Sequence, residues 1–203
     1  MAEIAVSQPQ NLPVGPVGRY GIGWWGVATL VASEAALFSY LLFAYYYTGA
    51  TTQQGWLLEP SPALKLALPN TLLLLLSSLA AWWGERGVLQ RRRPQALAGF
   101  GLAFLMGCGF VAVQCLEWHS KTYGIGVSSY ASLYFVTTGF HIVHVLVGLL
   151  VLLAIFGWTA LDYFSPRRHL VVSAGVLYWH FVDVVWLFVF TTYYLTPYLG
   201  FGR

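Results

Sequence analysis

Charged residues are scarce in this sequence. Asp, Glu, Lys and Arg make up only 8% of its 203 residues, whereas a soluble domain contains about a quarter. In contrast, 58% of the residues are hydrophobic and 17% are aromatic. A soluble fold of this length cannot bury so much apolar surface. The composition therefore excludes a cytosolic enzyme and a disordered chain, and the net charge of +3 is too small for a nucleic-acid-binding protein. A membrane protein is predicted.

Cysteine is scarce as well. Cys108 and Cys115 are the two cysteines of the sequence, and they are expected on one helix, roughly 10 Å apart along its axis. That separation is too large for a disulfide, and two thiols without His or carboxylate partners do not make a zinc site. We expect both to be small apolar residues that pack against neighbouring helices.

Five stretches are long and apolar enough to cross a bilayer, which takes about 20 residues. They cover residues 24–47, 66–84, 95–117, 129–158 and 169–195. The links between them are too short for a soluble domain, and residues 1–20 lack the apolar core of a signal peptide. We therefore expect an all-α fold, with residues 1–20 as an N-terminal arm and residues 21–203 as one five-helix transmembrane bundle.

The distribution of Lys and Arg predicts the orientation, because cytoplasmic links carry the excess of positive charge. With five crossings, the N-terminus and the second and fourth links share one side. That side carries seven basic residues: Arg19, Arg86, Arg91, Arg92, Arg93, Arg167 and Arg168. The other side carries three: Lys65, Lys121 and Arg203. We expect the N-terminus in the cytoplasm and the C-terminus outside.

Aromatic residues are expected in two belts, since their amphipathic rings favour the headgroup level of the membrane. The inner belt would contain Trp24, Trp25, Trp82, Trp83 and Trp158. The outer belt would contain Tyr45, Tyr46, Tyr47, Trp118, Tyr193 and Tyr194. Near the inner belt, the run Arg91, Arg92 and Arg93 is typical of a topology signal and is also suited to anionic lipid headgroups.

Five ionisable residues lie near the middle of the expected spans, where a charge is costly and marks a candidate functional site. These residues are Glu34 in the first span, His141 and His144 in the fourth, and His180 and Asp183 in the fifth. Each of the two pairs has a spacing of three residues, which places both members on one helix face. We expect Asp183 to orient His180 through a hydrogen bond or an ion pair. A proton-conducting role for this pair is the weaker alternative.

His141 and His144 also have the spacing of a shared metal site. A haem with two His ligands needs a second helix at matching depth, and a di-metal site needs more His and carboxylate ligands than the chain has. Hydrogen bonding to neighbouring helices or to a partner is therefore the favoured role. Glu34 keeps two interpretations: a protonated carboxyl that donates to a carbonyl or a His, or a proton- or lipid-related site.

Three segments resemble subunit III of the haem-copper terminal oxidases. They read SEAALFSYLLFAYYY over residues 33–47, TGFHIVHVLVG over 138–148 and YWHFVDVVWL over 178–187. The segment from Phe104 to Glu117 and the start of the second span at Pro69 are similar to that family too. The resemblance covers about residues 23–196. Many members of the family have seven helices, and this chain resembles the shorter, five-helix bacterial form.

The resemblance implies an accessory subunit of a bacterial inner-membrane oxidase fed by cytochrome c. Such a subunit binds no haem and no copper, packs on catalytic subunit I beside subunit II and in some cases a small subunit IV, holds phospholipids, and supports proton uptake and turnover stability. The complex reduces oxygen and translocates protons, but the redox site lies outside this chain. The intramembrane polar residues of the family motifs correspond here to Glu34, Glu117, His141, His144, His180 and Asp183.

Two other functions remain open at this point. Subunit III of a quinol-fed oxidase has the same five helices, because the electron donor binds other subunits. A stand-alone transporter or proton channel would also contain intramembrane Glu, His and Asp. The absence of an inverted repeat in the sequence and of paired broken helices disfavours the transporter.

Overall fold

The computed structural model of the protein describes residues 22–52, 55–58, 62, 64–166 and 168–202. Over these residues the regular secondary structure is helical apart from one isolated bridge between Ser165 and Arg168, and the links are turns and irregular loops. The helices are α1 (Ile22–Thr51), α2 (Leu64–Leu89), α3 (Arg93–Ser120), α4 (Ser129–Ala160), α5 (Leu170–Phe190), the π-helix η1 (Thr191–Leu195) and the 3-10 helix η2 (Thr196–Leu199). Five of these segments are long and apolar enough to cross a membrane. The all-α, five-span prediction is confirmed, whereas the predicted arm at residues 1–20 lies outside the described residues.

Local sequence features explain where several helices begin and end. Ser128 precedes α4, and its side chain accepts a hydrogen bond from the backbone N–H of Ala131 at 3.1 Å, as a helix N-cap does. In α3, a proline occupies the first turn, where its missing N–H costs nothing. Pro69 lies inside α2, one turn from its start. Helices satisfy their own backbone polar groups, which is the requirement for crossing lipid.

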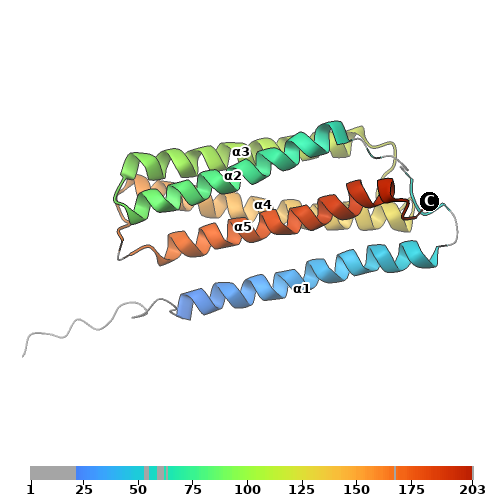
Figure 1. The fold of residues 1–203 in the computed structure, drawn as a ribbon, viewed down its shortest axis with the longest axis horizontal. Coiled ribbons are helices and arrows are strands. Elements are labelled where there is room, and N and C mark those ends of the chain that lie inside the picture. The colour runs from blue at the N-terminus through green and yellow to red at the C-terminus, as the bar shows by residue number, and fades with distance from the viewer. Residues whose placement is uncertain (1–21, 53–54, 59–61, 63, 167, 203) are drawn as a thin grey trace, which may run out of the picture.

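Four helices, α2 to α5, form the core of the bundle, and α1 lies outside them against α4 and α5 (Figure 1). The most extensive contact joins α2 and α3. Small residues allow this contact, because a Cβ added to Gly99 would lie 2.5 Å from the backbone of Gly84. Gly99, Ala103 and Gly107 form a stripe of small residues on α3, and all three are buried. Such stripes let membrane helices approach closely.

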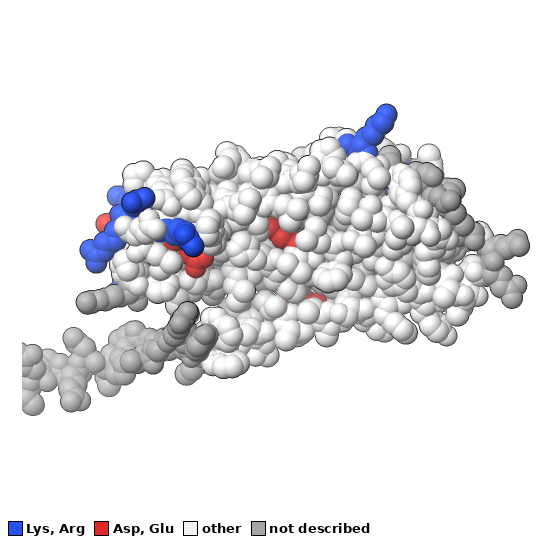
Figure 2. Space-filling model, in the orientation of Figure 1, with Lys and Arg blue, Asp and Glu red and all other residues white. Residues whose placement is uncertain are grey.

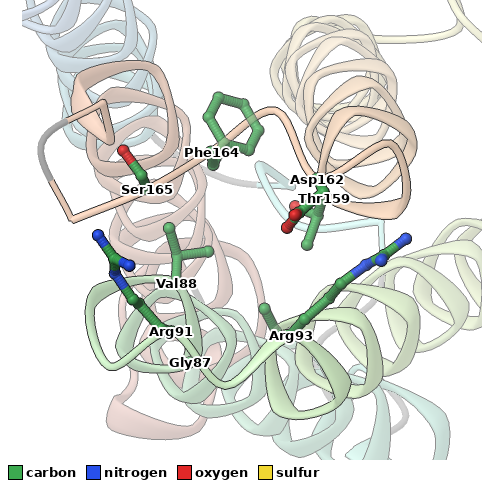
Figure 3. Close-up of a pocket in the computed structure, with 9 residues that line it drawn as sticks. Gly87, Val88, Arg91, Arg93, Thr159, Asp162, Phe164 and Ser165 are labelled. Carbon is green, nitrogen blue, oxygen red and sulfur yellow. The ribbon is translucent and has the colours of Figure 1, made fainter.

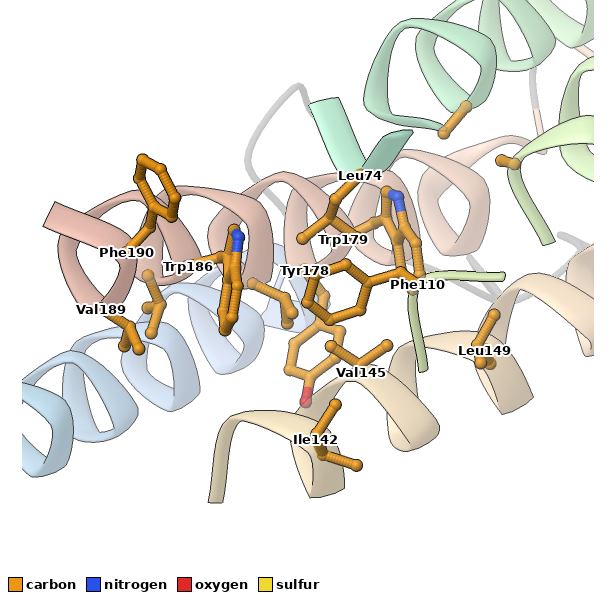
Figure 4. Close-up of a cluster of buried hydrophobic side chains, with 14 of the residues drawn as sticks. Leu74, Phe110, Ile142, Val145, Leu149, Tyr178, Trp179, Trp186, Val189 and Phe190 are labelled. Carbon is orange, nitrogen blue, oxygen red and sulfur yellow. The ribbon is translucent and has the colours of Figure 1, made fainter. Parts of the chain in front are cut away.

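Two tryptophans of α5 fill the centre of the core (Figure 4). Trp179 and Trp186 are almost completely buried. Glycines make room for the first of them, since a Cβ on Gly107 or Gly148 would approach the Trp179 ring to 2.8 or 2.7 Å. The Trp186 ring packs edge-on against Phe110, with ring centroids 4.8 Å apart. The indole N–H groups of both tryptophans donate to hydroxyls of α2, at 3.0 Å in each case.

The two ends of the bundle differ in chemistry. The α2–α3 and α4–α5 links lie at one end, together with Arg86, Arg91, Arg92, Arg93 and Arg168, and we call it the arginine end. The opposite end, which holds the α1–α2 and α3–α4 links, η1 and η2, is rich in buried tyrosine, and we call it the tyrosine end. Figure 2 shows basic side chains gathered at the arginine end, a basic side chain also at the opposite end, and a surface along the middle with only small patches of acidic atoms.

One expectation about side-chain placement, that for the two cysteines, is wrong. Cys108 and Cys115 are exposed on the outer surface of α3 and do not pack against neighbouring helices. In the outer aromatic belt, Tyr45, Tyr193 and Tyr194 are buried at 0–1% exposure. The Tyr45 and Tyr193 rings pack on one another, with centroids 4.8 Å apart, and the Tyr194 ring stacks on that of Phe190 at 5.4 Å. Helical periodicity places some belt residues on the inner face, and the sequence does not reveal which face is inner.

Candidate functional site

Glu34 of α1 and His144 of α4 form a polar contact between the outer helix and the core. Glu34 Oε2 and His144 Nε2 lie 2.9 Å apart. The other ring nitrogen, His144 Nδ1, lies 2.7 Å from the carbonyl oxygen of Phe140. The Phe38 ring packs edge-on against the His144 ring, with centroids 5.1 Å apart. His144 thus makes two hydrogen bonds. In the bond to the backbone the donor is always the histidine, whereas in the bond to the carboxyl group either partner can be the donor.

This geometry determines how many protons the pair holds. A carbonyl oxygen only accepts hydrogen bonds, so His144 Nδ1 carries a proton and donates it to Phe140. The proton between His144 and Glu34 then belongs either to the carboxyl group or to Nε2. The pair is either two neutral groups or an ion pair, and its net charge is zero in both cases. Such a pair can pass one proton between its members without placing net charge in the membrane.

The Glu34–His144 pair is close to the outer surface of the bundle. The Glu34 side chain is 27% exposed and that of His144 is 13% exposed. Tyr178 of α5 donates to the carbonyl oxygen of His144 at 3.4 Å, which connects the pair to a third helix. The pair is therefore held by protein on one side and accessible to lipid or to a partner on the other.

His141 lies one turn from His144 but in a different environment. It is completely buried between aromatic rings, with centroids 4.9 Å from Trp186 and 5.8 Å from Phe110. Neither of its ring nitrogens has a hydrogen-bond partner in the structure. Within the described part of the chain, no group of three or more His, Cys, Asp and Glu side chains could hold a metal ion. The two histidines therefore do not share a site, despite their spacing.

His180 and Asp183 of α5 meet at a third residue, Ser78 of α2. The Ser78 hydroxyl donates to Asp183 Oδ2, and Ser78 Oγ lies 2.7 Å from His180 Nδ1. Because the hydroxyl has one proton, its oxygen must accept from Nδ1–H of His180. Asp183 is buried at 3% exposure, whereas His180 borders an apolar hollow on the outer face of α2 and α5. The serine replaces the direct bond that the spacing of three residues suggests.

Glu117 is the acidic residue of the tyrosine end. It is 5% exposed and accepts from the hydroxyls of Tyr194 and Tyr134 at 2.5 and 3.3 Å. Lys121 Nζ lies 3.6 Å from the same carboxylate oxygen, one turn further along α3. The neighbouring Gln114 is fully buried. This cluster links α3, α4 and the C-terminal π-helix, and it is distant along α4 from the Glu34–His144 pair.

Sequence reasoning missed the hydroxyl groups that complete these sites. Ser78 lies in a leucine-rich stretch of the sequence. The one feature that could have marked it as a site residue is that Ser77 and Ser78 interrupt the run of leucines. Tyr194 is predicted from the sequence only as a belt residue, and no pattern in the sequence singles out Tyr134. A hydroxyl has no cost comparable to that of a charge in the membrane, so its presence alone does not mark a site.

Comparison with known proteins identifies the family. The chain matches the family described as "Cytochrome c oxidase subunit III" over residues 17–198. It is 32% identical to cytochrome c oxidase subunit 3 of Gallus gallus over 177 residues, which cover 84% of this chain and 68% of the relative. The protein of the same name from Locusta migratoria is 32% identical, with 84% and 67% covered. That from Latimeria chalumnae is 30% identical over 191 residues, with 91% and 71% covered. The chain is therefore a member of the cytochrome c oxidase subunit III family, a multi-pass membrane subunit of a respiratory haem-copper oxidase.

Proposed function

We propose that this chain is a non-catalytic subunit that packs directly on catalytic subunit I, beside subunit II and a small subunit IV, in a bacterial plasma membrane. Cytochrome c is the proposed electron donor of the complex, and the haems and copper belong to the partner subunits. The supporting observation is that polar groups reach the outer surface in mid-membrane, at Glu34 and at His180. Polar groups at that depth face protein or a water-filled cavity rather than lipid, so a partner covers them.

The Glu34–His144 pair gives the subunit a role in proton uptake and lipid binding. It holds one transferable proton at net zero charge, and it lies at the surface of the bundle. A proton passed to this pair from one side can be released on the other without a net charge remaining in the membrane. Bound phospholipids fill the apolar hollow between α1, α4 and α5, about 380 Å³ in volume, that borders the same helices.

The arginine end is the proposed cytoplasmic end. Among the described residues it carries five arginines, whereas the tyrosine end carries Lys65 and Lys121. Arg19, Arg167 and Arg203, which also entered the prediction, lie outside the described residues. Arg92→Cys and Lys65→Cys, each in a background without the two native cysteines, place a thiol at opposite ends. A membrane-impermeant maleimide applied to intact spheroplasts should label only the Lys65→Cys chain, and labelling of Arg92→Cys alone would reverse the orientation.

Purification through an affinity tag on this chain tests the proposed function. In mild detergent, we expect haem-containing subunits to co-purify, visible in a reduced-minus-oxidised spectrum, with oxygen consumption that depends on reduced cytochrome c. Turnover with quinol and not with cytochrome c would assign the chain to a quinol-fed oxidase. A stable, haem-free chain would contradict the oxidase assignment and favour a stand-alone transporter.

A further inference from the structure

A polar hollow lies at the arginine end, between the α2–α3 link and the α4–α5 link. Its volume is about 330 Å³. Its polar lining comes from Arg91 and Arg93 on one link and from Thr159, Asp162 and Ser165 at the other. Figure 3 shows Arg91 and Ser165 on one side of the hollow and Asp162 on the opposite side. A single hollow thus presents a cation and an anion that face each other.

The end of α2 places Arg91 in an unfavourable backbone conformation. The N–H of Arg92 bonds to the carbonyl of Gly87 at 2.7 Å, and the N–H of Arg91 bonds to that of Val88 at 3.2 Å. This pair of bonds is the Schellman motif, in which the residue at the position of Arg91 is left-handed and is most often glycine. Arg91 has a φ of 57°. A long charged side chain therefore occupies a position at which glycine is favoured.

The end of α4 repeats the same motif with an acidic residue. The N–H of Tyr163 bonds to the carbonyl of Trp158 at 3.0 Å, and the N–H of Asp162 bonds to that of Thr159 at 3.1 Å. Asp162 also has a φ of 57°. Asp tolerates this conformation better than Arg does, but glycine is again the favoured residue. Both helices thus end on a strained charged residue, and both charges line the same hollow.

Neither charge is neutralised within the described structure. The ion pairs among the described residues involve other side chains, and Arg91 and Asp162 form none with one another. Arg93 is a second cation of the lining, and its Nη2 donates to the carbonyl oxygen of Ala160, which ties the α2–α3 link to the end of α4. Strained residues persist where the strain serves binding, and an unpaired cation opposite an unpaired anion suits a ligand that carries both charges.

The hollow lies at the depth of lipid headgroups. Trp82, Trp83 and Trp158 are 43–45% exposed near this end of the bundle, and exposed tryptophans favour the headgroup region. Leu89 and Leu161, at the ends of α2 and α4, are 41% and 78% exposed. Apolar side chains beside the polar hollow can contact acyl chains, whereas a soluble phosphate would gain nothing from them.

We propose that this hollow binds the headgroup of phosphatidylethanolamine. The Arg91 guanidinium and the Ser165 hydroxyl bind the phosphodiester, since arginine is suited to phosphate. The Asp162 carboxylate accepts hydrogen bonds from the primary ammonium. Phosphatidylglycerol has no ammonium for Asp162, and the quaternary ammonium of phosphatidylcholine has no N–H to donate. This site rests on the lipid-binding role proposed above and adds a second lipid position to it. All the residues that line the site belong to this chain.

Glycine substitutions test the site without destabilising the fold. Arg91→Gly and Asp162→Gly each remove one charge and also relieve the left-handed strain, so the variants should fold at least as well as the parent chain. Arg92→Gln is the matched control, because it removes a neighbouring charge that does not line the hollow. Each full-length chain is purified with whatever subunits accompany it, delipidated with detergent, and mixed with phosphatidylethanolamine, phosphatidylglycerol or phosphatidylcholine. Native mass spectrometry then counts the lipids bound.

We expect the parent chain and Arg92→Gln to bind one more phosphatidylethanolamine than Arg91→Gly does, with an affinity loss of about tenfold in that variant. Asp162→Gly should lose the preference for phosphatidylethanolamine over phosphatidylglycerol. Glycerophosphoethanolamine, which lacks acyl chains, should compete only weakly, and strong competition would instead show a site for a soluble phosphodiester.

Three results would overturn the proposal: equal binding of all three lipids by the parent chain, unchanged binding in both glycine variants, or lipid loss that parallels a fall in thermal stability. Haem content is recorded in the same samples. Haem co-purification with no effect on lipid binding would refute only this site, and absence of haem would refute the oxidase assignment independently.

Discussion

Helix α1 and the four-helix core are held in place by different means. In the most apolar 18-residue stretch of α1, 11% of the residues are buried, against 50% in the segment that contains α5. The core is assembled from small residues and large rings that fit one another, as Gly99 against Gly84 and Trp179 against Gly148 show. The attachment of α1 includes the Glu34–His144 pair and two tyrosine hydrogen bonds, from Tyr45 to Thr196 and from Tyr46 to Thr192.

The difference follows from the physics of the membrane. Lipid tails are as apolar as leucine, so helix association depends on close packing and on hydrogen bonds between helices. The core helices associate through close packing, because their small residues and large rings have complementary shapes. Helix α1 has little buried surface and depends more on the second. An outer helix with so much exposed surface is suited to contacts with other subunits or with lipid, whereas the core determines whether the chain folds.

The largest expected effect is in the core, at the contact of α2 with α3. Gly99→Ala places a methyl group 2.5 Å from the backbone of Gly84, which cannot move aside as a side chain can. We expect a loss of about 3 kcal/mol in stability and a chain nearly absent from membranes, measured by immunoblot. Gly101→Ala is the matched control on the same helix, because its methyl group would lie 3.4 Å from the Phe156 ring. Equal levels of the two variants would contradict the close-packing account.

An intermediate effect is expected where hydrogen bonds join α2 to α5. Asp183→Leu leaves the Ser78 hydroxyl, which itself accepts from the His180 ring, without its acceptor. The cost should be about 1–3 kcal/mol, measured as a lower thermal unfolding midpoint and a lower yield of assembled complex. Asp183→Asn keeps an acceptor oxygen for Ser78 and should retain most of the stability. If Asp183→Leu assembles as well as Asp183→Asn does, the serine-centred cluster has no structural role.

The smallest effect is expected at the attachment of α1. Glu34→Leu removes the hydrogen bond to His144 and should cost about 0.6–2 kcal/mol, visible as faster loss of lipid or of partner subunits in detergent. Glu34→Gln still offers a donor to His144 Nε2, so its assembly should be normal. Because glutamine holds no transferable proton, that variant separates proton transfer from attachment: slower proton uptake with intact assembly is expected. Unchanged lipid retention, subunit content and turnover lifetime in Glu34→Leu would show that the pair does not attach α1.

Much of the architecture could be predicted from the sequence, because long apolar runs are compatible with few folds other than a bundle of membrane-spanning helices. Once five stretches exceed the thickness of a bilayer and the links are short, an all-α bundle follows from the need to satisfy backbone hydrogen bonds. The helices extend beyond the predicted spans at several ends; α2, for example, ends at Leu89 and not at residue 84. Charged and polar residues at a membrane surface continue a helix as well as apolar ones do, so hydropathy underestimates its length.

Only part of each candidate site could be predicted from the sequence. Glu34, His180 and Asp183 could be identified because an ionisable group is rare in mid-membrane. Their partners could not, since His144 is 110 residues away from Glu34 and Ser78 is 102 residues away from His180. The same holds for the hollow at the arginine end, where Arg91 was expected to contact lipid headgroups but its counterpart Asp162 was not considered.

Three properties thus follow from the residues alone: the five membrane-spanning helices, the residues whose charge is costly at that depth, and the family to which the motifs belong. Each of these properties depends on local composition or on short strings of residues. Three other features depend on the packing of the helices: Glu34 pairs with His144 and not with His141, a serine joins His180 to Asp183, and Arg91 faces Asp162. Those choices depend on how the helices rotate and cross, and small residues such as Gly84 and Gly99 set that geometry through contacts between distant segments.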